Sequence, residues 1–164
     1  MRLSEFNEAG VEQAGDLLHT CAPIPSWRAA LLARRPYGSR AELVETARGL
    51  AGGWTDQEVD GALAHHPRIG EKLQAEGAEA EASRREQSGL SEDEKTREEW
   101  VRANLAYEER FGRIFLIRAK GRSSEEMLAQ LRERLENSPE EEAAVRRDQL
   151  AEIALLRLGE AVQD

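Results

Sequence analysis

Apolar residues recur along the chain with the three- and four-residue spacing of amphipathic helices. One stripe consists of Trp100, Asn104, Tyr107 and Phe111, with Val101 and Leu105 beside it. A second stripe consists of Met127, Leu128, Leu131 and Leu135. This periodicity predicts that helices are the main elements of the fold.

Helix start signals recur between these stripes. A hydroxyl residue followed three positions later by glutamate forms a capping box, which satisfies free amides at a helix start. This pattern begins at Ser39, Thr55, Ser91, Ser123 and Ser138. Pro139 then takes the first helical position, where its missing N–H costs nothing. With the glycines that should end helices, these signals predict helices over 5–20, 26–34, 40–51, 56–64, 72–79, 83–88, 92–111, 124–136 and 139–161.

One segment has an extended character, the four apolar residues 114–117 between Gly112 and Gly121. A single short strand has no partner to pair with, so we interpret this segment as a buried connector. Its backbone amides would lack sheet partners and could bind a ligand, although water or capping satisfies such groups more often.

The chain has 164 residues, enough to bury one substantial core. No internal repeat, low-complexity tract or long linker divides it. We therefore predict an all-α fold, a single domain over 1–164 built as an irregular bundle of about eight to nine helices.

Charge and composition narrow the partners and the compartment. The chain carries 23 basic and 32 acidic residues, a net charge of −9, which argues against nucleic acid or an anionic membrane as the main partner. An anionic small substrate would need a local basic group. The first residues lack the apolar segment of a signal peptide, and no run approaches the roughly 20 apolar residues that cross a bilayer. The single cysteine, Cys21, suits a reducing compartment. We expect a cytoplasmic protein.

The first candidate for chemistry is the sequence His65-His66-Pro67. A proline disfavours helical backbone in the residue before it, so His66 should lie at a helix end or in an extended turn. Histidine exchanges protons near neutral pH, which makes His66 a candidate acid or base. A structural histidine at a capped helix end is the alternative. We interpret His65 as a helix-end or surface residue.

A second candidate cluster is Ser83, Glu86, Gln87 and Leu90, whose spacing places all four on one face of a helix. A hydroxyl, a carboxylate and an amide would then share one patch. Ser83 and Glu86 also match the capping box, which is sufficient to explain that pair. Gln87 has no role in such a cap.

Arg157 is unusual because it lies in an apolar turn, on one face with Leu150, Ile153 and Ala154. An arginine there either extends to the surface or meets a buried anion. A guanidinium cannot lose its charge, so a buried one requires a partner that matches its fork of N–H donors. An internal ion pair with a glutamate and a bound ligand both stay open.

Patterns for metal or phosphate binding are not found. The chain has no Cys-x-x-Cys and no His-Glu-x-x-His, and His19 lies far from the other histidines. It also has no Gly-x-Ser-x-Gly elbow and no glycine-rich phosphate loop. Without a supporting motif, Cys21 is interpreted as a small buried hydrophobic residue.

Taken together, His66-Pro67-Arg68-Ile69-Gly70 and Ser83-x-x-Glu86-Gln87-x-Gly89-Leu90 resemble the paired motifs of the 2-oxo-4-hydroxy-4-carboxy-5-ureidoimidazoline (OHCU) decarboxylase family. The resemblance extends to 21–27, Arg35-Pro36-Tyr37, 111–117 and the closing Glu152-Ile153 with Arg157-Leu158. It departs at Tyr37, where the family more often has phenylalanine, and in the short charged stretch 74–82. Neither departure removes a proposed catalytic group.

This resemblance implies an all-α enzyme, usually a homodimer, that needs no cofactor and no metal. It implies decarboxylation of OHCU to (S)-allantoin in urate degradation, with His66 and Glu86 as the catalytic pair. The substrate-binding residues that it implies are Pro67, Ser83, Gln87 and Arg157, together with Phe115, Leu116, Ile117 and Arg118, which would act through backbone amides.

Two other functions stay open. One is a related all-α decarboxylase or hydrolase of another ureido or imidazole acid. The other is a non-catalytic helical binding module, with Glu86 as a cap and Arg157 in an internal salt bridge. His66 together with Gln87 favours an enzyme, because capping does not explain them. The two enzymes can be separated only by a substrate assay.

Overall fold

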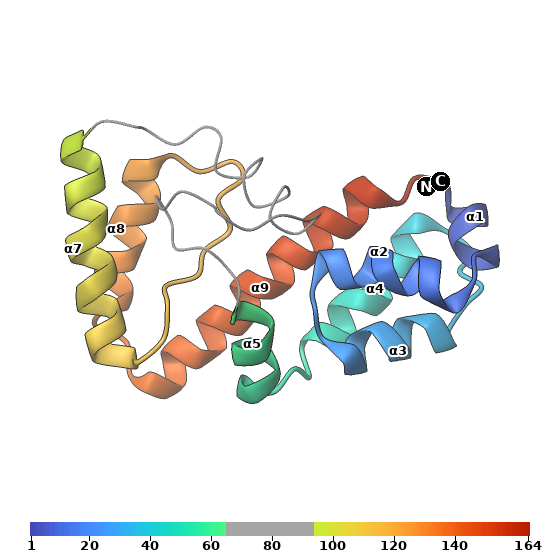
Figure 1. The fold of residues 1–164 in the computed structure, drawn as a ribbon, viewed down its shortest axis with the longest axis horizontal. Helices are drawn as coiled ribbons and strands as arrows, with labels where there is room; N and C mark the ends of the chain where they lie inside the picture. The colour runs from blue at the N-terminus through green and yellow to red at the C-terminus, as the bar shows by residue number, and fades with distance from the viewer. Residues whose placement is uncertain (65–93) are drawn as a thin grey trace. The chain divides into compact units, whose positions relative to one another are not determined.

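The computed structural model describes residues 1–64 and 94–164, and within these ranges the regular structure is helical apart from one isolated bridge between Arg2 and Gln163 (Figure 1). The predicted all-α class is confirmed. The chain divides into two compact units, Met1–Ala64 with Leu150–Asp164, and His65–Gln149. The helices predicted over 72–79 and 83–88 lie outside the described residues.

The first unit contains α1 (Leu3–Glu8), α2 (Val11–Cys21), α3 (Pro25–Ala33), α4 (Arg40–Ala51) and α5 (Asp56–Leu63), with the last turns of α9 (Pro139–Ala161). Trp27 is one of the largest buried side chains of this unit, with 2% of its surface exposed. The indole N–H of Trp27 donates to the carbonyl of Ala47 at 3.1 Å, and its ring meets Trp54 edge to face. Because the hydrogen bond satisfies the one polar atom of Trp27, its whole side chain can be buried.

The single helix predicted over 5–20 is wrong, because the chain leaves the helical conformation at Ala9 and Gly10 and forms α1 and α2 instead. The backbone ψ angles of these two residues are 150° and 156°. The guanidinium of Arg35 donates to the carbonyls of Phe6 and Ala9 at 2.9 and 2.7 Å. These bonds satisfy carbonyls that the end of α1 leaves unpaired. A cap supplied from a distant position leaves no local pattern in the sequence.

Helix starts agree with the capping signals wherever the structure describes them. Side-chain hydroxyls accept the N–H of the residue three positions later at Ser39, Thr55, Ser123 and Ser138. The reciprocal bond from the glutamate is present for Glu58 and Glu141. Glu42 instead accepts the N–H of Gly38 at 2.6 Å. Ser91 lies outside the described residues.

The described part of the second unit contains α7 (Glu94–Phe111), α8 (Ser124–Arg134) and the first turns of α9. α7 and α8 lie side by side and are joined by a non-helical segment, 112–123 (Figure 1). Gly112 and Gly121 have φ angles of +68° and +81°, a left-handed conformation that glycine adopts without strain, and they turn the chain into and out of this segment.

Both predicted apolar stripes face the core of the second unit. This core comprises Trp100, Ala103, Tyr107, Phe115, Ile117, Ala119, Met127, Leu128 and Leu131, with Phe111 and Leu135 at its edge. Val101 and Leu105, beside the first stripe in sequence, are 67% and 57% exposed because α7 buries a single face. None of the described helices is both long enough and apolar enough to cross a membrane.

Candidate active site

The predicted site residues divide into two groups. His66, Pro67, Ser83, Glu86 and Gln87 lie outside the described residues, so their roles stay predictions. Phe115, Leu116, Ile117 and Arg118 belong to the second unit and Arg157 to the first.

Arg157 is buried in α9, with 6% of its surface exposed, which excludes the alternative that it extends to solvent. Its Nη1 lies 3.5 Å from the carbonyls of Thr20 and Cys21, at the end of α2. The last carbonyls of a helix carry partial negative charge and favour a cation beside them. The end of α2 therefore offsets part of the free energy needed to bury the guanidinium.

Cys21 matches its interpretation as a buried hydrophobic residue. It is 1% exposed, and its thiol donates to the carbonyl of Leu17. Burial raises the pKa of the Cys21 thiol to about 12, although the nearby Arg157 acts in the opposite direction. A thiol with so high a pKa is a poor nucleophile at neutral pH.

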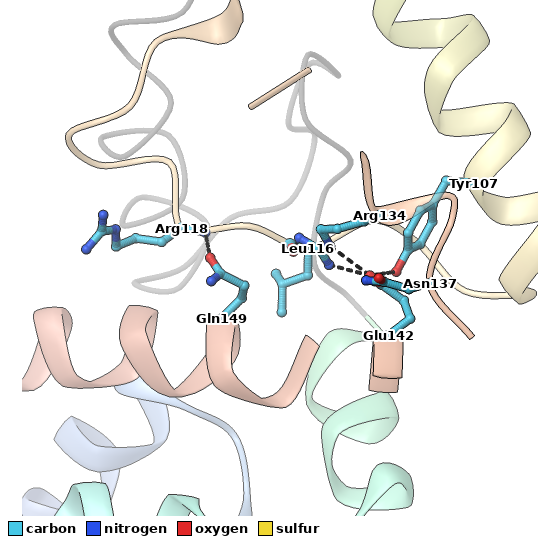
Figure 2. Close-up of polar contacts among 7 residues, drawn as sticks. All are labelled: Tyr107, Leu116, Arg118, Arg134, Asn137, Glu142 and Gln149. Carbon is cyan, nitrogen blue, oxygen red and sulfur yellow. Dashed lines mark hydrogen bonds and ion pairs between the residues drawn. The ribbon is translucent and has the colours of Figure 1, made fainter. Parts of the chain in front are cut away.

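The connector predicted over 114–117 is non-helical, and it is buried from Phe115 to Ile117. With Arg118 it contains the residues predicted to bind the substrate through backbone amides. Phe115, Leu116 and Ile117 are 2%, 1% and 2% exposed. Two side chains hold its backbone (Figure 2). Nη1 of Arg134 donates to the carbonyl of Leu116, and the N–H of Arg118 donates to Oε1 of Gln149, each at 2.9 Å.

Arg134 belongs to a buried polar cluster, in which the side chains of Arg134, Tyr107 and Asn137 converge on Glu142 (Figure 2). Nε and Nη2 of Arg134 donate to Oε1 of Glu142 at 2.9 and 2.5 Å. The Tyr107 hydroxyl donates to the same oxygen at 2.5 Å, and the Asn137 amide donates to Oε2 at 3.0 Å. The guanidinium carbon also lies 4.4 Å from the centre of the Phe115 ring. A buried ion pair requires such additional hydrogen bonds to be stable.

Sequence reasoning did not single out Arg134, Glu142 or Gln149. Glu142 follows Glu140 and Glu141 in the first turn of α9, where any acidic residue is favourable at a helix start. Only burial distinguishes it, because Glu142 is 1% exposed while the other two are exposed. Neighbouring sequence contains no sign of this difference.

The two contacts to the connector fall on either side of Ile117. Within residues 1–64 and 94–164, neither the N–H nor the carbonyl of Ile117 has a hydrogen-bond partner, although the residue is buried. Buried backbone groups are nearly always paired with protein, water or ligand. Ile117 therefore provides one donor and one acceptor that a ligand could use.

Elsewhere in the described ranges, no group of three histidine, cysteine or acidic side chains could hold a metal ion. A pocket of about 420 Å³ is formed by α7 and α8, lined by Glu99, Arg102, Ala103, Ala106, Arg132 and Leu135. None of the predicted site residues lines it, so it is not part of the candidate site.

Comparisons with known proteins agree with the resemblance seen in the motifs. The family model described as OHCU decarboxylase matches residues 7–159. The 2-oxo-4-hydroxy-4-carboxy-5-ureidoimidazoline decarboxylase of Amia calva is 30% identical, over 95% of this chain and 89% of that protein. The uric acid degradation bifunctional protein of Bacillus sp. (strain TB-90) is 27% identical over 100% of this chain. The match covers 33% of that relative, so the chain spans about a third of its length.

Solved structures give the same result. The crystal structure of OHCU decarboxylase in the presence of (S)-allantoin matches with a TM-score of 0.72 and 26% identity, over 87% of this chain and 94% of that one. A crystal structure of (S)-allantoin synthase matches with a TM-score of 0.71 over 99% of this chain and 54% of that one; at 17% identity it shows a likeness of fold alone. The extent of the family match and the identity to the Amia calva enzyme show that the chain belongs to the OHCU decarboxylase family of lyases.

Proposed function

We propose that this protein catalyses the cofactor-independent decarboxylation of OHCU to (S)-allantoin, a step of urate degradation. The observation that carries the proposal is the match to the Amia calva OHCU decarboxylase, which extends over 89% of that enzyme. The solved OHCU decarboxylase with (S)-allantoin supports the same substrate and product. A homodimer, which the family resemblance implies, and a cytoplasmic location, which the composition predicts, are part of the proposal.

The chemistry needs little more than orientation and proton transfer. Carbon 4 of OHCU carries a carboxylate and a hydroxyl, next to an imine-like carbon 5. When the bond to the carboxylate breaks, CO2 leaves and the electron pair passes into the ring. The hydroxyl loses its proton as carbon 4 becomes a carbonyl, and the former imine nitrogen gains a proton. Carbon 5 also gains a proton and becomes the stereocentre of allantoin. Starting from the carboxylate, the reaction takes up one proton in total.

The proposed proton-transfer group is His66, acting at the hydroxyl of carbon 4 or at the new C–H bond. Glu86 would hydrogen-bond the substrate, orient it with His66 and disfavour the departing carboxylate by like-charge repulsion. Pro67 would fix the imidazole beneath the substrate. Ser83 and Gln87 would bind the ureido and ring amides.

Arg157 is the proposed anchor for a carbonyl or the carboxylate of the substrate. Two observations support this role. Its guanidinium is buried and permanently charged, and a chain with a net charge of −9 needs such a local cation to attract an anionic substrate. Its fork of N–H donors matches the geometry of a carboxylate.

The backbone of 115–118 is the proposed binding surface for the neutral part of the substrate. The N–H and the carbonyl of Ile117, which have no hydrogen-bond partner among the described residues, complement a ureide, which carries N–H and C=O groups side by side. The Arg118 N–H already has an acceptor in Gln149. The proposal therefore gives the contact with the substrate to the earlier amides of the segment.

Turnover of freshly generated OHCU by His66→Asn and Glu86→Ala, with His65→Asn as the matched control, tests the catalytic pair. We expect His66→Asn to lower kcat by about 10²–10⁴-fold, the usual worth of general acid–base catalysis, while His65→Asn stays near wild type. Each variant must retain the wild-type circular dichroism spectrum and melting temperature. Turnover by His66→Asn within about threefold of wild type would contradict the assignment.

A further inference from the structure

The connector that the proposed function assigns to substrate binding is held at two adjacent peptide groups. Arg134 binds the carbonyl of Leu116, and Gln149 binds the N–H of Arg118. All of these residues belong to the second unit. Gln149 lies on α9 and its side chain points towards the backbone at Arg118 (Figure 2).

A peptide group is planar and trans, so its carbonyl and its N–H point in opposite directions. The carbonyl of Leu116 shares a peptide group with the N–H of Ile117. The N–H of Arg118 shares the next peptide group with the carbonyl of Ile117. The side chain of Arg134 therefore sets the direction of the Ile117 N–H, and the side chain of Gln149 sets the direction of the Ile117 carbonyl.

These directions matter because the N–H and the carbonyl of Ile117 have no hydrogen-bond partner within residues 1–64 and 94–164. A ligand that bonds to both groups needs the two peptide planes in fixed orientations. Each plane can rotate about its flanking Cα bonds, since the connector lies outside helices and has no sheet partner within the described ranges. Side-chain hydrogen bonds thus replace the regular secondary structure that would otherwise fix these planes.

We propose that Gln149 is a positioning residue, which holds the peptide group between Ile117 and Arg118 so that the Ile117 carbonyl faces the ureide part of the substrate. This inference rests on the proposed function. Gln149 would not touch the substrate; it acts through the backbone of the connector. Arg134 has the same relation to the preceding peptide group but also forms a buried ion pair with Glu142. A substitution of Arg134 would therefore change both the position of the backbone and the stability of the fold, whereas a substitution of Gln149 tests the position of the backbone alone.

The test compares two substitutions that keep the length of the side chain. Gln149→Met removes the acceptor oxygen, and Gln149→Glu retains an acceptor at the same place. Gln130→Met on α8 is the matched control, because Gln130 is also half-buried and its side chain has no hydrogen bond within the described part of the chain. The probe is (S)-allantoin, an uncharged ureide, so the added charge of Gln149→Glu affects its binding little.

We expect Gln149→Met to weaken (S)-allantoin binding about three- to tenfold, the range of one net hydrogen bond, and to raise KM more than it lowers kcat. Gln149→Glu and Gln130→Met should bind like wild type. Amide hydrogen exchange followed by NMR gives a local readout. The Arg118 N–H should exchange faster in Gln149→Met than in wild type, and Gln149→Glu should restore its protection.

Wild-type affinity in Gln149→Met, or tighter binding, would overturn the positioning role while leaving the proposed function intact. A Gln149→Glu variant as weak as Gln149→Met would also overturn it. If wild type neither binds (S)-allantoin nor converts OHCU, the proposed function itself fails and the positioning role fails with it. The wild-type measurement thus separates the two failures.

Discussion

Arg134 holds the connector through the Leu116 carbonyl, and Glu142 holds Arg134 through a buried ion pair. The pair is almost fully buried, and its remaining hydrogen-bonding groups are used by Tyr107, Asn137 and the Leu116 carbonyl. Burying two charges is unfavourable unless such bonds compensate for lost hydration. The pair as a whole therefore adds little net stability, but removal of one partner leaves a buried charge without compensation and is strongly destabilising.

Replacement of Arg134 by methionine leaves Glu142 buried without its cation. We expect Arg134→Met to reduce the free energy of unfolding by about 3–5 kcal/mol. Arg132→Met, two residues away on the same helix, removes an exposed arginine that lies 3.9 Å from Glu99, and it should cost less than about 1 kcal/mol. Urea denaturation of both variants gives the comparison; equal losses would contradict the account of the buried pair.

Cys21 provides a second test at the residue scale, because it is the single cysteine of the chain. With its pKa raised from 9.0 to about 12, its thiolate population at about pH 8 falls by roughly a thousandfold. We expect no labelling by a thiol reagent in the folded protein and complete labelling after unfolding in denaturant. Rapid labelling of the folded protein would show that Cys21 is accessible.

At this scale the sequence revealed residues whose type is unusual for their surroundings and missed those whose type is ordinary. Arg157 stands out because its neighbours are apolar, and its burial was one of the two predicted alternatives. Gln149 lies in a charged stretch that resembles any solvated helix face. Its contact with Arg118 depends on packing between segments 31 residues apart, which no local pattern encodes.

Among the helices, α5 offers the clearest test of the capping signals. Thr55 accepts the N–H of Glu58, and Glu58 accepts the N–H of Thr55 in return. We expect Thr55→Ala to lower the free energy of unfolding by about 1 kcal/mol, a typical value for a lost N-cap. Thermal and urea unfolding measure the change.

The matched control is Thr46→Ala on α4, where the hydroxyl donates to the carbonyl of Glu42 within an exposed helix face. Such a bond adds little to helix stability, so the control should change stability by less than about 0.5 kcal/mol. If Thr46→Ala is as damaging as Thr55→Ala, the loss reflects the change of residue type and not the cap.

Helix boundaries could be predicted where a cap is local, as at Ser39, Thr55, Ser123 and Ser138. They could not be predicted where the cap comes from elsewhere in the chain, as Arg35 does for the end of α1. The connector was predictable because four apolar residues between glycines suit neither an amphipathic helix nor a lone strand.

For the whole molecule, the two tyrosines report on both units, Tyr37 in the first and Tyr107 in the second. Burial raises the pKa of Tyr37 to about 12; its hydroxyl donates to the carbonyl of Leu31. Burial, followed by the hydrogen bond to Glu142, raises the pKa of Tyr107 above its usual value. Neither hydroxyl should ionise in the folded protein near pH 10, where tyrosine in an unfolded chain does.

Folded pKa values above the unfolded value mean that the folded state binds more protons in alkaline solution, so stability falls as pH rises. The contribution of Tyr37 is complete below about pH 10 and is lost between about pH 10 and 12. We expect the ultraviolet absorbance of tyrosinate to be absent at about pH 10 in folded protein and to appear there in denaturant. A midpoint near 10 for the folded protein would contradict the burial of these hydroxyls.

At the scale of the whole chain, the motifs around His66 and Glu86 are enough to indicate the family, and the match over residues 7–159 shows that family. The arrangement of the catalytic pair is a different matter. Both residues lie outside the described ranges, and local spacing alone does not separate a catalytic Glu86 from a helix cap. The assignment of His66 and Glu86 as the catalytic pair therefore rests on the turnover of the His66→Asn and Glu86→Ala variants.

The most direct test of the central claim is the chirality of the product. Urate, a urate oxidase and a hydroxyisourate hydrolase would generate OHCU in the cuvette, and circular dichroism would follow allantoin with and without this protein. The account predicts rapid appearance of (S)-allantoin alone, faster than the spontaneous reaction. A slow, racemic product at the same rate with and without the protein would contradict it.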